Sequence, residues 1–280
     1  FKQKTAYEML RSLVGSEMCI RDSVYIDAVK SNFLQKRSTG NKQFAALDFD
    51  GWVESVINEM SFSNVLDICC GTGNQLILYS HNSKNSKLIG VDLSHDSLQI
   101  AEKRLNISKS NDQLDLILGK MDETFSLDGV YQEKFDLISC FYGLYYADNS
   151  ELLLNRAIEN LNSQGNILIV GPYGDNNKAF FDILLKYFDL PELVYRSSST
   201  FMESEVLPVL ENKLKVEKKY FVNKIVYPDL RSVMNYWKST TFFNSDFEKE
   251  VEADLLKHFE INPSFILEKH VMAIIANKDY

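Results

Sequence analysis

Short apolar runs alternate with helical patterns through the middle of this chain. Five runs carry apolar residues at consecutive positions, which is typical of strands buried on both faces: NVLDIC (64–69), KLIGVDL (87–93), LDLILGK (114–120), FDLISC (135–140) and NILIVGP (166–172). Helical spacing lies between several of them, near residues 74–82, 95–106 and 149–162. Strands that alternate with helices predict a mostly parallel sheet with helices on both faces, which is a doubly wound α/β fold.

The segments on either side of this core predict a helical cap and a sheet edge. Apolar residues fall on one helical face between Phe49 and Met60, and we interpret residues 24–62 as an N-terminal helical cap to a domain formed by residues 63–280. After the fifth strand, residues 177–188 predict a helix and the polar stretch 195–205 predicts a loop that leads to a further helix. We therefore expect a helical insertion at about 175–212. The last predicted elements are strands at 215–227 and 265–278 and helices near 229–238 and 246–259.

Composition and charge restrict the partners. The 280 residues are 45% hydrophobic and 25% charged, with a formal net charge of −9, so a general nucleic-acid or anionic-membrane binder is disfavoured. No run approaches the ~20 apolar residues of a membrane span, and no charged and then apolar leader opens the chain. Four cysteines give neither a secreted disulfide framework nor paired zinc spacing. We expect a cytoplasmic protein with no metal, no nucleic acid and no membrane partner.

The first residues stand apart from the fold. The stretch FKQKTAYEMLRSLVGSEMCIRDS, residues 1–23, resembles the translated sequencing-adapter read-through that precedes many metagenomic reading frames. This resemblance implies that the segment carries no function and that the natural sequence begins near Val24.

A glycine-containing loop follows the first predicted strand. In VLDICCGTGN, Val65 to Asn74, the strand runs into a turn with Gly71 and Gly73 before a helix, which aims backbone amides at a ligand. A phosphate-binding P-loop would require GxxxxGK[ST], which is absent. The dinucleotide fingerprint GxGxxG would require a third glycine where Leu76 stands.

This loop resembles motif I of the class I methyltransferases, which use S-adenosylmethionine and carry an acidic residue before a GxGxG loop. Cys69 replaces the first glycine of that motif, and we expect it to adopt an ordinary negative φ because it bears a Cβ. Asp67 is expected to orient the loop or the methionine amino group of the cofactor. The resemblance implies a cofactor-binding loop formed by Asp67, Cys69, Cys70, Gly71, Gly73 and Asn74.

Later segments keep the order of the same family. LIGVDLS places Asp92 and its neighbour Leu93 at the end of the second strand, where the resemblance implies that the acid binds the ribose hydroxyls. An NAD enzyme would also use such an acid, so Asp92 alone does not discriminate. LGKMDETF implies that Met121 and Asp122 border the adenine, and Cys140 is expected to line the cofactor pocket. The resemblance covers roughly residues 60–175 and implies a seven-stranded Rossmann-like sheet.

Aromatic residues follow the fourth and fifth strands. Tyr142, Tyr146 and Tyr173 lie where open α/β folds bind ligands, and we expect them to border an acceptor, with core packing as the alternative role. The segment SCFYGLYY lacks the [DNS]PP[YF] signature of amino-group nucleic-acid methyltransferases. A small-molecule or sugar acceptor is therefore favoured. His270 lies in a predicted apolar strand and is expected to be structural.

The expected reaction is transfer of the activated methyl group of S-adenosylmethionine to this acceptor by in-line displacement. No residue is assigned as the catalytic base, and the acceptor identity and the oligomeric state stay open. A noncatalytic S-adenosylmethionine-binding protein and an NAD-dependent oxidoreductase remain as alternatives.

Overall fold

A seven-stranded sheet forms the centre of the computed structural model, which describes residues 43–82, 86–107 and 113–278. The strand order is β3-β2-β1-β4-β5-β7-β6. The strands are β1 (Asn64–Ile68), β2 (Lys87–Asp92), β3 (Gln113–Leu118), β4 (Phe135–Phe141), β5 (Leu161–Pro172), β6 (Lys215–Tyr227) and β7 (Phe265–Asn277).

The first five strands are parallel, and β7 lies antiparallel between β5 and β6. The sheet runs outward in both directions from β1 and β4, so the chain reverses its winding direction there. The predicted doubly wound, mostly parallel sheet is confirmed. The fifth strand starts earlier than predicted, at Leu161, because Leu161 pairs with Phe135 before an irregularity in the ladder.

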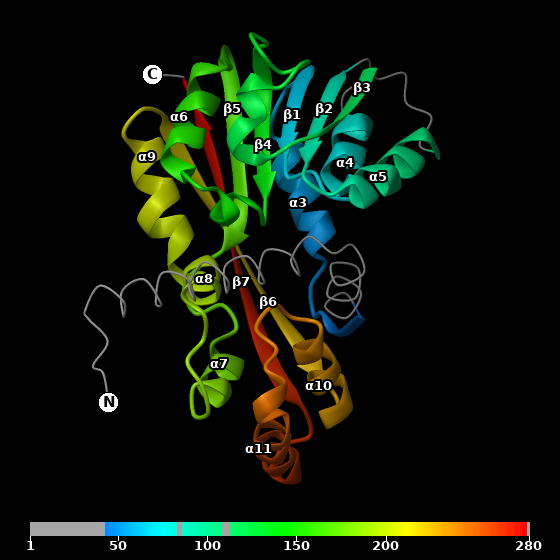
Figure 1. Cartoon of the computed structure of the whole chain (residues 1–280), viewed down its shortest axis with the longest axis vertical. Coiled ribbons are helices and arrows are strands. Elements are labelled where there is room, and N and C mark those ends of the chain that lie inside the picture. Colours follow the sequence, from blue (N-terminus) through cyan, green and yellow to red (C-terminus); the bar gives the residue numbers. More distant parts are fainter. Residues whose placement is uncertain (1–42, 83–85, 108–112, 279–280) are drawn as a thin grey trace, which may run out of the picture.

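Helices cover both faces of the sheet (Figure 1). One face packs against α3 (Phe49–Ile57), α4 (Asn74–Asn82) and α5 (His95–Ile107). The other face packs against the 3₁₀ helix η1 (Met121–Ser126), α6 (Ser150–Glu159) and α9 (Leu207–Glu211). Neighbouring residues of one strand enter opposite cores, as Leu66 and Val65 of β1 do, which explains the continuous apolar runs in the sequence.

The long strands β6 and β7 extend beyond the other five and carry a third hydrophobic core (Figure 1). The helices around this core are α7 (Lys178–Leu184), α10 (Leu230–Lys238) and α11 (Glu248–Ile261). Trp237 is fully buried at its centre, and its indole nitrogen donates to the Phe242 carbonyl at 3.2 Å. The far halves of β6 and β7 thus form a lower lobe below the carboxyl-terminal edge of the parallel strands.

The polar stretch 195–205 is helical, so the prediction of a loop there was wrong. It continues α8 (Glu192–Tyr195) through two π-helical segments, η3 (Arg196–Thr200) and η4 (Met202–Val206), into α9. Phe201, Met202 and Val206 are buried in the core between the sheet and η1, α6 and α9, which we call the main core. This burial stabilises a helix that the polar residues of the stretch do not indicate in the sequence. π-Helical segments are uncommon and occur frequently at functional sites.

The predictions for residues 1–23 and for residues 24–42 of the N-terminal cap lie outside the described residues. Within the described ranges, no helix is long and apolar enough to cross a membrane.

Candidate functional site

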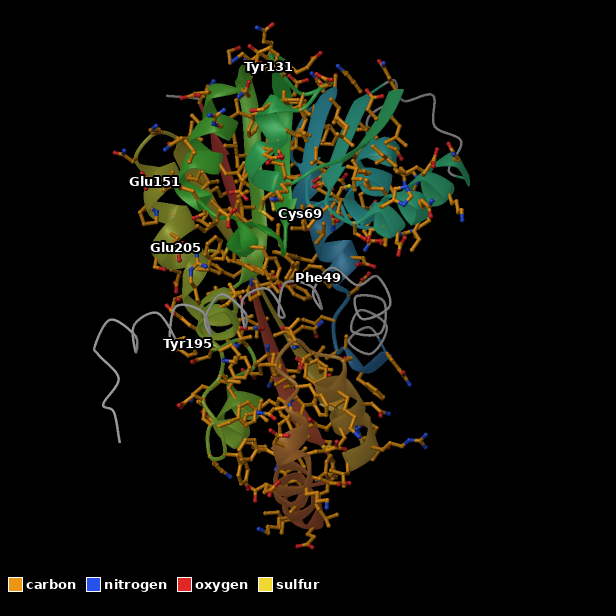
Figure 2. All side chains as sticks on the ribbon, in the orientation of Figure 1. Phe49, Cys69, Tyr131, Glu151, Tyr195 and Glu205 are labelled. Carbon is orange, nitrogen blue, oxygen red and sulfur yellow. The ribbon has the colours of Figure 1, made fainter. Side chains whose placement is uncertain are left out.

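The carboxyl-terminal ends of β1, β2 and β4 meet at one edge of the sheet, and the glycine loop lies at that edge. The loop is held to β2 by a hydrogen bond from the Cys70 amide to the Val91 carbonyl at 3.1 Å. It closes by a second bond from the Gly73 amide to the Cys70 carbonyl at 3.0 Å. Figure 2 shows Cys69 of this loop near the level at which the upper and lower halves of the molecule meet.

Cys69 has a φ of +61°, so the expected ordinary φ at this position was wrong. The turn requires a left-handed residue here, which costs a side-chain-bearing residue free energy. The space for the thiol comes from Gly143, since a Cβ at that position would lie 2.6 Å from the Cys69 Cβ. The chain therefore retains the backbone of the glycine motif without its first glycine.

Gly71 and Gly73 provide the positive φ angles of the turn, +53° and +78°. A Cβ built on Gly73 would lie 3.0 Å from the Cβ of Ala101, so this glycine allows the loop to approach α5 closely. A Cβ built on Gly71 would meet nothing within 4 Å. The backbone at Gly71 thus faces open space, as a loop that cradles a ligand requires.

Asp92 ends β2 with its carboxylate held by the backbone. Its Oδ2 accepts from the Gly71 amide at 2.8 Å, and its Oδ1 accepts from the Ser94 amide at 2.8 Å. Burial raises the pKa of Asp92, and these amide hydrogen bonds oppose that rise. Each carboxylate oxygen keeps a lone pair for a further donor, which fits the two hydroxyls of a ribose.

Asp67 lies in β1 directly beneath the loop and is 1% exposed. Its Oδ1 accepts from the Ser139 hydroxyl at 2.7 Å, whereas its Oδ2 has no hydrogen-bond partner among the described residues. Burial raises the pKa of Asp67 to about 7, with a further rise from the charge of Asp92 and an opposing effect of the Ser139 hydrogen bond. A buried carboxyl with a free oxygen fits a site that receives a cationic group.

Three thiols lie around the same loop. Cys70 and Cys140 are buried, and Cys69 is partly exposed. A hydrogen bond with the Cys140 thiol, and then burial, raise the pKa of Cys69 well above its ordinary value. Burial likewise raises the pKa of Cys70. Cys69 and Cys70 therefore stay protonated at neutral pH, so they are packing groups and not nucleophiles.

Arg104 of α5 holds the loop from outside, a role that the sequence did not indicate. Its guanidinium donates to the Thr72 carbonyl at 2.7 Å and to the side chain of Asn74 at 2.7 Å. Asn74, one of the predicted loop residues, therefore binds Arg104 through its Oδ1. No sequence signal could have found this contact, because it depends on how α5 packs against the loop.

The other residues predicted to bind the cofactor, Leu93 and the adenine-bordering Met121 and Asp122, follow β2 and β3. Leu93 is 36% exposed at the end of β2. Met121 is buried in the main core at the start of η1. The Asp122 carboxylate accepts from the Asp148 amide at 2.9 Å and from the Asn149 amide at 3.3 Å. Asp122 thus also ties η1 to the loop before α6.

The predicted aromatic residues occupy different surroundings. Tyr142 follows β4 with a φ of +53°, is 38% exposed, and contacts Phe49 of α3 edge to face at 6.1 Å between ring centroids. Tyr146 is partly buried against the main core. Tyr173 follows β5 and contacts His270 and Tyr220, with ring centroids 5.7 Å and 5.2 Å away.

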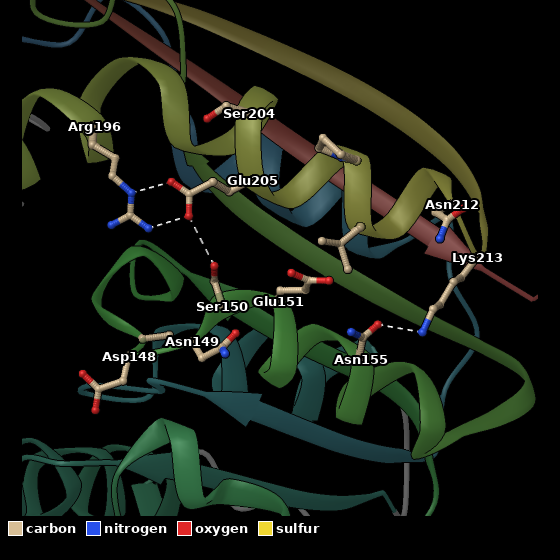
Figure 3. Close-up of a pocket in the computed structure, with 13 residues that line it drawn as sticks. Asp148, Asn149, Ser150, Glu151, Asn155, Arg196, Ser204, Glu205, Asn212 and Lys213 are labelled. Carbon is tan, nitrogen blue, oxygen red and sulfur yellow. Dashed lines mark hydrogen bonds and ion pairs between the residues drawn. The ribbon is translucent and has the colours of Figure 1, made fainter.

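A groove of about 720 Å³ runs between α6 and the η3–α9 helix (Figure 3). Arg196 crosses its end, where the guanidinium forms a two-point ion pair with Glu205, and Ser150 donates to the same carboxylate at 3.3 Å. The Arg196 guanidinium also donates to the Tyr145 carbonyl at 3.4 Å. The groove lies beside the glycine-loop edge and not at it, and this ion pair supports the loop that carries Tyr145 and Tyr146.

Across the described ranges, no group of three His, Cys, Asp or Glu side chains could hold a metal ion. The donor set of the edge is one buried carboxyl, one backbone-held carboxylate and the amides of a glycine turn. These groups fit an organic ligand with hydroxyl and ammonium groups.

Comparisons with known proteins agree with this geometry. A family model described as "Methyltransferase domain" matches residues 60–224. An uncharacterized protein of Haemophilus influenzae is 30% identical over 122 residues, which are 41% of this chain and 44% of that protein. A demethylmenaquinone methyltransferase of Leptospira interrogans is 30% identical over 112 residues, which are 38% and 42% of the two chains. The match therefore spans less than half of the length of these curated relatives.

Two solved structures share the fold. A methyltransferase structure from Bacillus halodurans superposes with a TM-score of 0.58 at 16% identity and covers 82% of this chain and 98% of its own. The plantazolicin methyltransferase BpumL, solved in complex with S-adenosylhomocysteine (SAH), gives a TM-score of 0.51 at 15% identity over 96% and 99% of the two chains. On the match of the family model to most of its length, the chain belongs to the class I S-adenosylmethionine-dependent methyltransferase family.

Proposed function

We propose that this protein transfers a methyl group from S-adenosylmethionine to a small-molecule or sugar acceptor. The observation that carries the proposal lies at the carboxyl-terminal edge of the sheet. There the Asp92 carboxylate accepts a hydrogen bond from the Gly71 amide, and open space adjoins the backbone of Gly71. In this reading Asp92 binds the ribose hydroxyls, and the amides of the loop and Asp67 bind the methionine portion. The cofactor supplies a methyl group already activated on a sulfonium.

The protein's own contribution to the reaction is to hold the acceptor in line with that methyl group. Tyr142, Tyr146 and Tyr173 follow β4 and β5 at the same edge. The contact of Phe49 with Tyr142 supports an acceptor site that α3 covers on one side. Their rings can pack on the apolar part of an acceptor, and their hydroxyls can meet its polar part. The relatives and structural neighbours support an organic acceptor, since they include a demethylmenaquinone methyltransferase and a plantazolicin methyltransferase.

Asp92→Ala should weaken SAH binding at least tenfold. The change removes two charge-assisted hydrogen bonds of roughly 1.5–3 kcal/mol each, less what water replaces. Isothermal titration calorimetry measures the loss, and Asp92→Asn should lose less because it keeps one acceptor oxygen. Asp96→Ala, which removes an exposed carboxylate in the first turn of α5, is the matched control and should bind as the wild type does. Unchanged affinity in Asp92→Ala would refute the ribose assignment.

Tyr142→Phe, Tyr146→Phe and Tyr173→Phe should each lower methyl transfer while sparing SAH affinity. Loss of one hydroxyl that positions the acceptor costs about 1 kcal/mol, or roughly fivefold in kcat/KM. Transfer of labelled methyl to a panel of quinols, phenols, sugars and heterocyclic peptides supplies the measurement. Tyr131→Phe is the control, because Tyr131 is 63% exposed on the turn before β4. SAH binding without transfer to any acceptor, in a pocket closed at the sulfur, would favour the noncatalytic alternative.

A further inference from the structure

A polar cluster lies in the core directly beneath the glycine loop. It consists of Asp67 in β1, Ser139 in β4 and Tyr79 in α4, and none of the three side chains is more than 1% exposed. Asp67 and Ser139 are register partners in neighbouring strands, and the Ser139 hydroxyl donates to Asp67 Oδ1 at 2.7 Å. Tyr79 reaches the cluster from the helix that follows the loop, and the Asp67 charge raises the pKa of its hydroxyl after the larger effect of burial.

Two polar atoms of this cluster are left without a partner among the described residues, Asp67 Oδ2 and the Tyr79 hydroxyl. Buried polar groups are usually paired, because an unpaired one loses its hydration without compensation. An ionised carboxylate in this position would be still more costly. The surroundings of Asp67 therefore favour its protonated form. A ligand that brings a cation to the loop would favour the ionised carboxylate instead.

The groups that face Asp67 act on its pKa in different directions. Asp92 approaches from β2, and its negative charge opposes ionisation of Asp67. Cys70 lies near it in the loop, with a pKa that burial and the Asp67 charge raise, so this thiol stays neutral. Ser139 from β4 is the group that favours the ionised form. Burial is the largest effect, and against the opposing Ser139 hydrogen bond burial and the Asp92 charge raise the pKa of Asp67 to about 7.

We propose that Asp67 stores a proton in the ligand-free protein, that binding of S-adenosylmethionine or SAH at the glycine loop releases it, and that Ser139 and Tyr79 are positioning residues for this exchange. The α-ammonium group of either ligand is the cation that stabilises the Asp67 carboxylate. The proton goes to the buffer, and no covalent bond changes in the ligand. This inference rests on the cofactor part of the proposed function and is independent of methyl transfer.

The test is calorimetric titration of the full chain with SAH in phosphate and in Tris, whose ionisation enthalpies differ. The difference between the two heats counts the protons released on binding. The pKa of Asp67 in the ligand-free protein is about 7. On binding, the wild type should therefore release about half a proton at pH 7, close to one at pH 6 and about a tenth at pH 8.

The variants test the positioning roles. Ser139→Ala removes the donor that favours the carboxylate, so its release profile should move to higher pH, and Ser139→Thr should restore the wild-type profile. Tyr79→Phe should also move the profile to higher pH, because it removes the second hydroxyl that can donate to the ionised Asp67, and an unmoved profile would overturn the positioning role of Tyr79. His81→Gln, which changes an exposed titratable residue at the end of α4, is the control and should release as many protons as the wild type.

The outcomes separate this inference from the proposed function. SAH binding with no proton release between pH 6 and 7, or with a release that Ser139→Ala leaves unchanged, overturns the inference alone. No SAH binding at all overturns both the inference and the cofactor assignment. Binding with the expected release but without methyl transfer supports the inference and contradicts only the catalytic proposal.

Discussion

Gly143→Ala should destabilise the protein by about 1–3 kcal/mol, and Cys69→Gly in the same chain should restore most of that loss. The new Cβ would lie 2.6 Å from the Cys69 Cβ and 2.8 Å from its Sγ, and both atoms sit on a constrained turn that cannot move aside easily. Removing the Cys69 side chain opens that space. The new Cβ then lies 3.3 Å from the Cys140 Sγ, a tight but tolerable contact.

Cys69→Gly alone should change stability little or raise it. The left-handed φ of +61° costs a residue with a Cβ roughly 1–2 kcal/mol, and glycine avoids that cost. Glycine also gains freedom in the unfolded chain, which offsets part of the benefit. Chemical denaturation of the two single variants and the double variant gives the coupling free energy. Additive effects of the two substitutions would mean that residues 69 and 143 do not share this space.

The sequence was sufficient for the parallel half of the sheet. Runs such as 135–140 carry apolar residues on both faces, and only a strand covered on both sides accommodates that pattern. The position of β7 between β5 and β6 is different, because no local pattern encodes which distant strand pairs with which. The pairing of Tyr227 with Phe265 is formed across two helices, and it became visible only in the structure.

The site was predictable where backbone chemistry dictates residue type. Gly71 and Gly73 are required by positive φ, and Asp92 ends a strand at a fixed place in the fold. Arg104 and Tyr79 could not be predicted, because their roles arise from the packing of α5 and α4 on the loop. Cys69 was misjudged for a related reason: the turn, and not the residue, determines the backbone angle there.

Asp67→Asn should stabilise the ligand-free protein at pH 8 while it weakens SAH binding at least tenfold. The pKa of Asp67 is about 7 in the folded protein, against an ordinary value of 3.8 for an aspartate in water. Between these values the folded state binds more protons than the unfolded state, so this group's contribution to stability falls as pH rises from about 4 to about 7 and is constant above. The difference corresponds to at most about 4 kcal/mol.

Asparagine is neutral at every pH and keeps an acceptor for the Ser139 hydroxyl, so it should regain part of that loss, about 1–2 kcal/mol at pH 8. The midpoint of thermal unfolding should rise by roughly 2–4 °C for each kcal/mol regained. At pH 4 the wild type also carries a neutral Asp67, so the two midpoints should nearly coincide there. Asp96→Asn, at an exposed carboxylate, should show no such pH dependence. A lower midpoint for Asp67→Asn at pH 8 would mean that the ionised carboxylate stabilises the fold, and that this residue does not sacrifice stability for ligand binding.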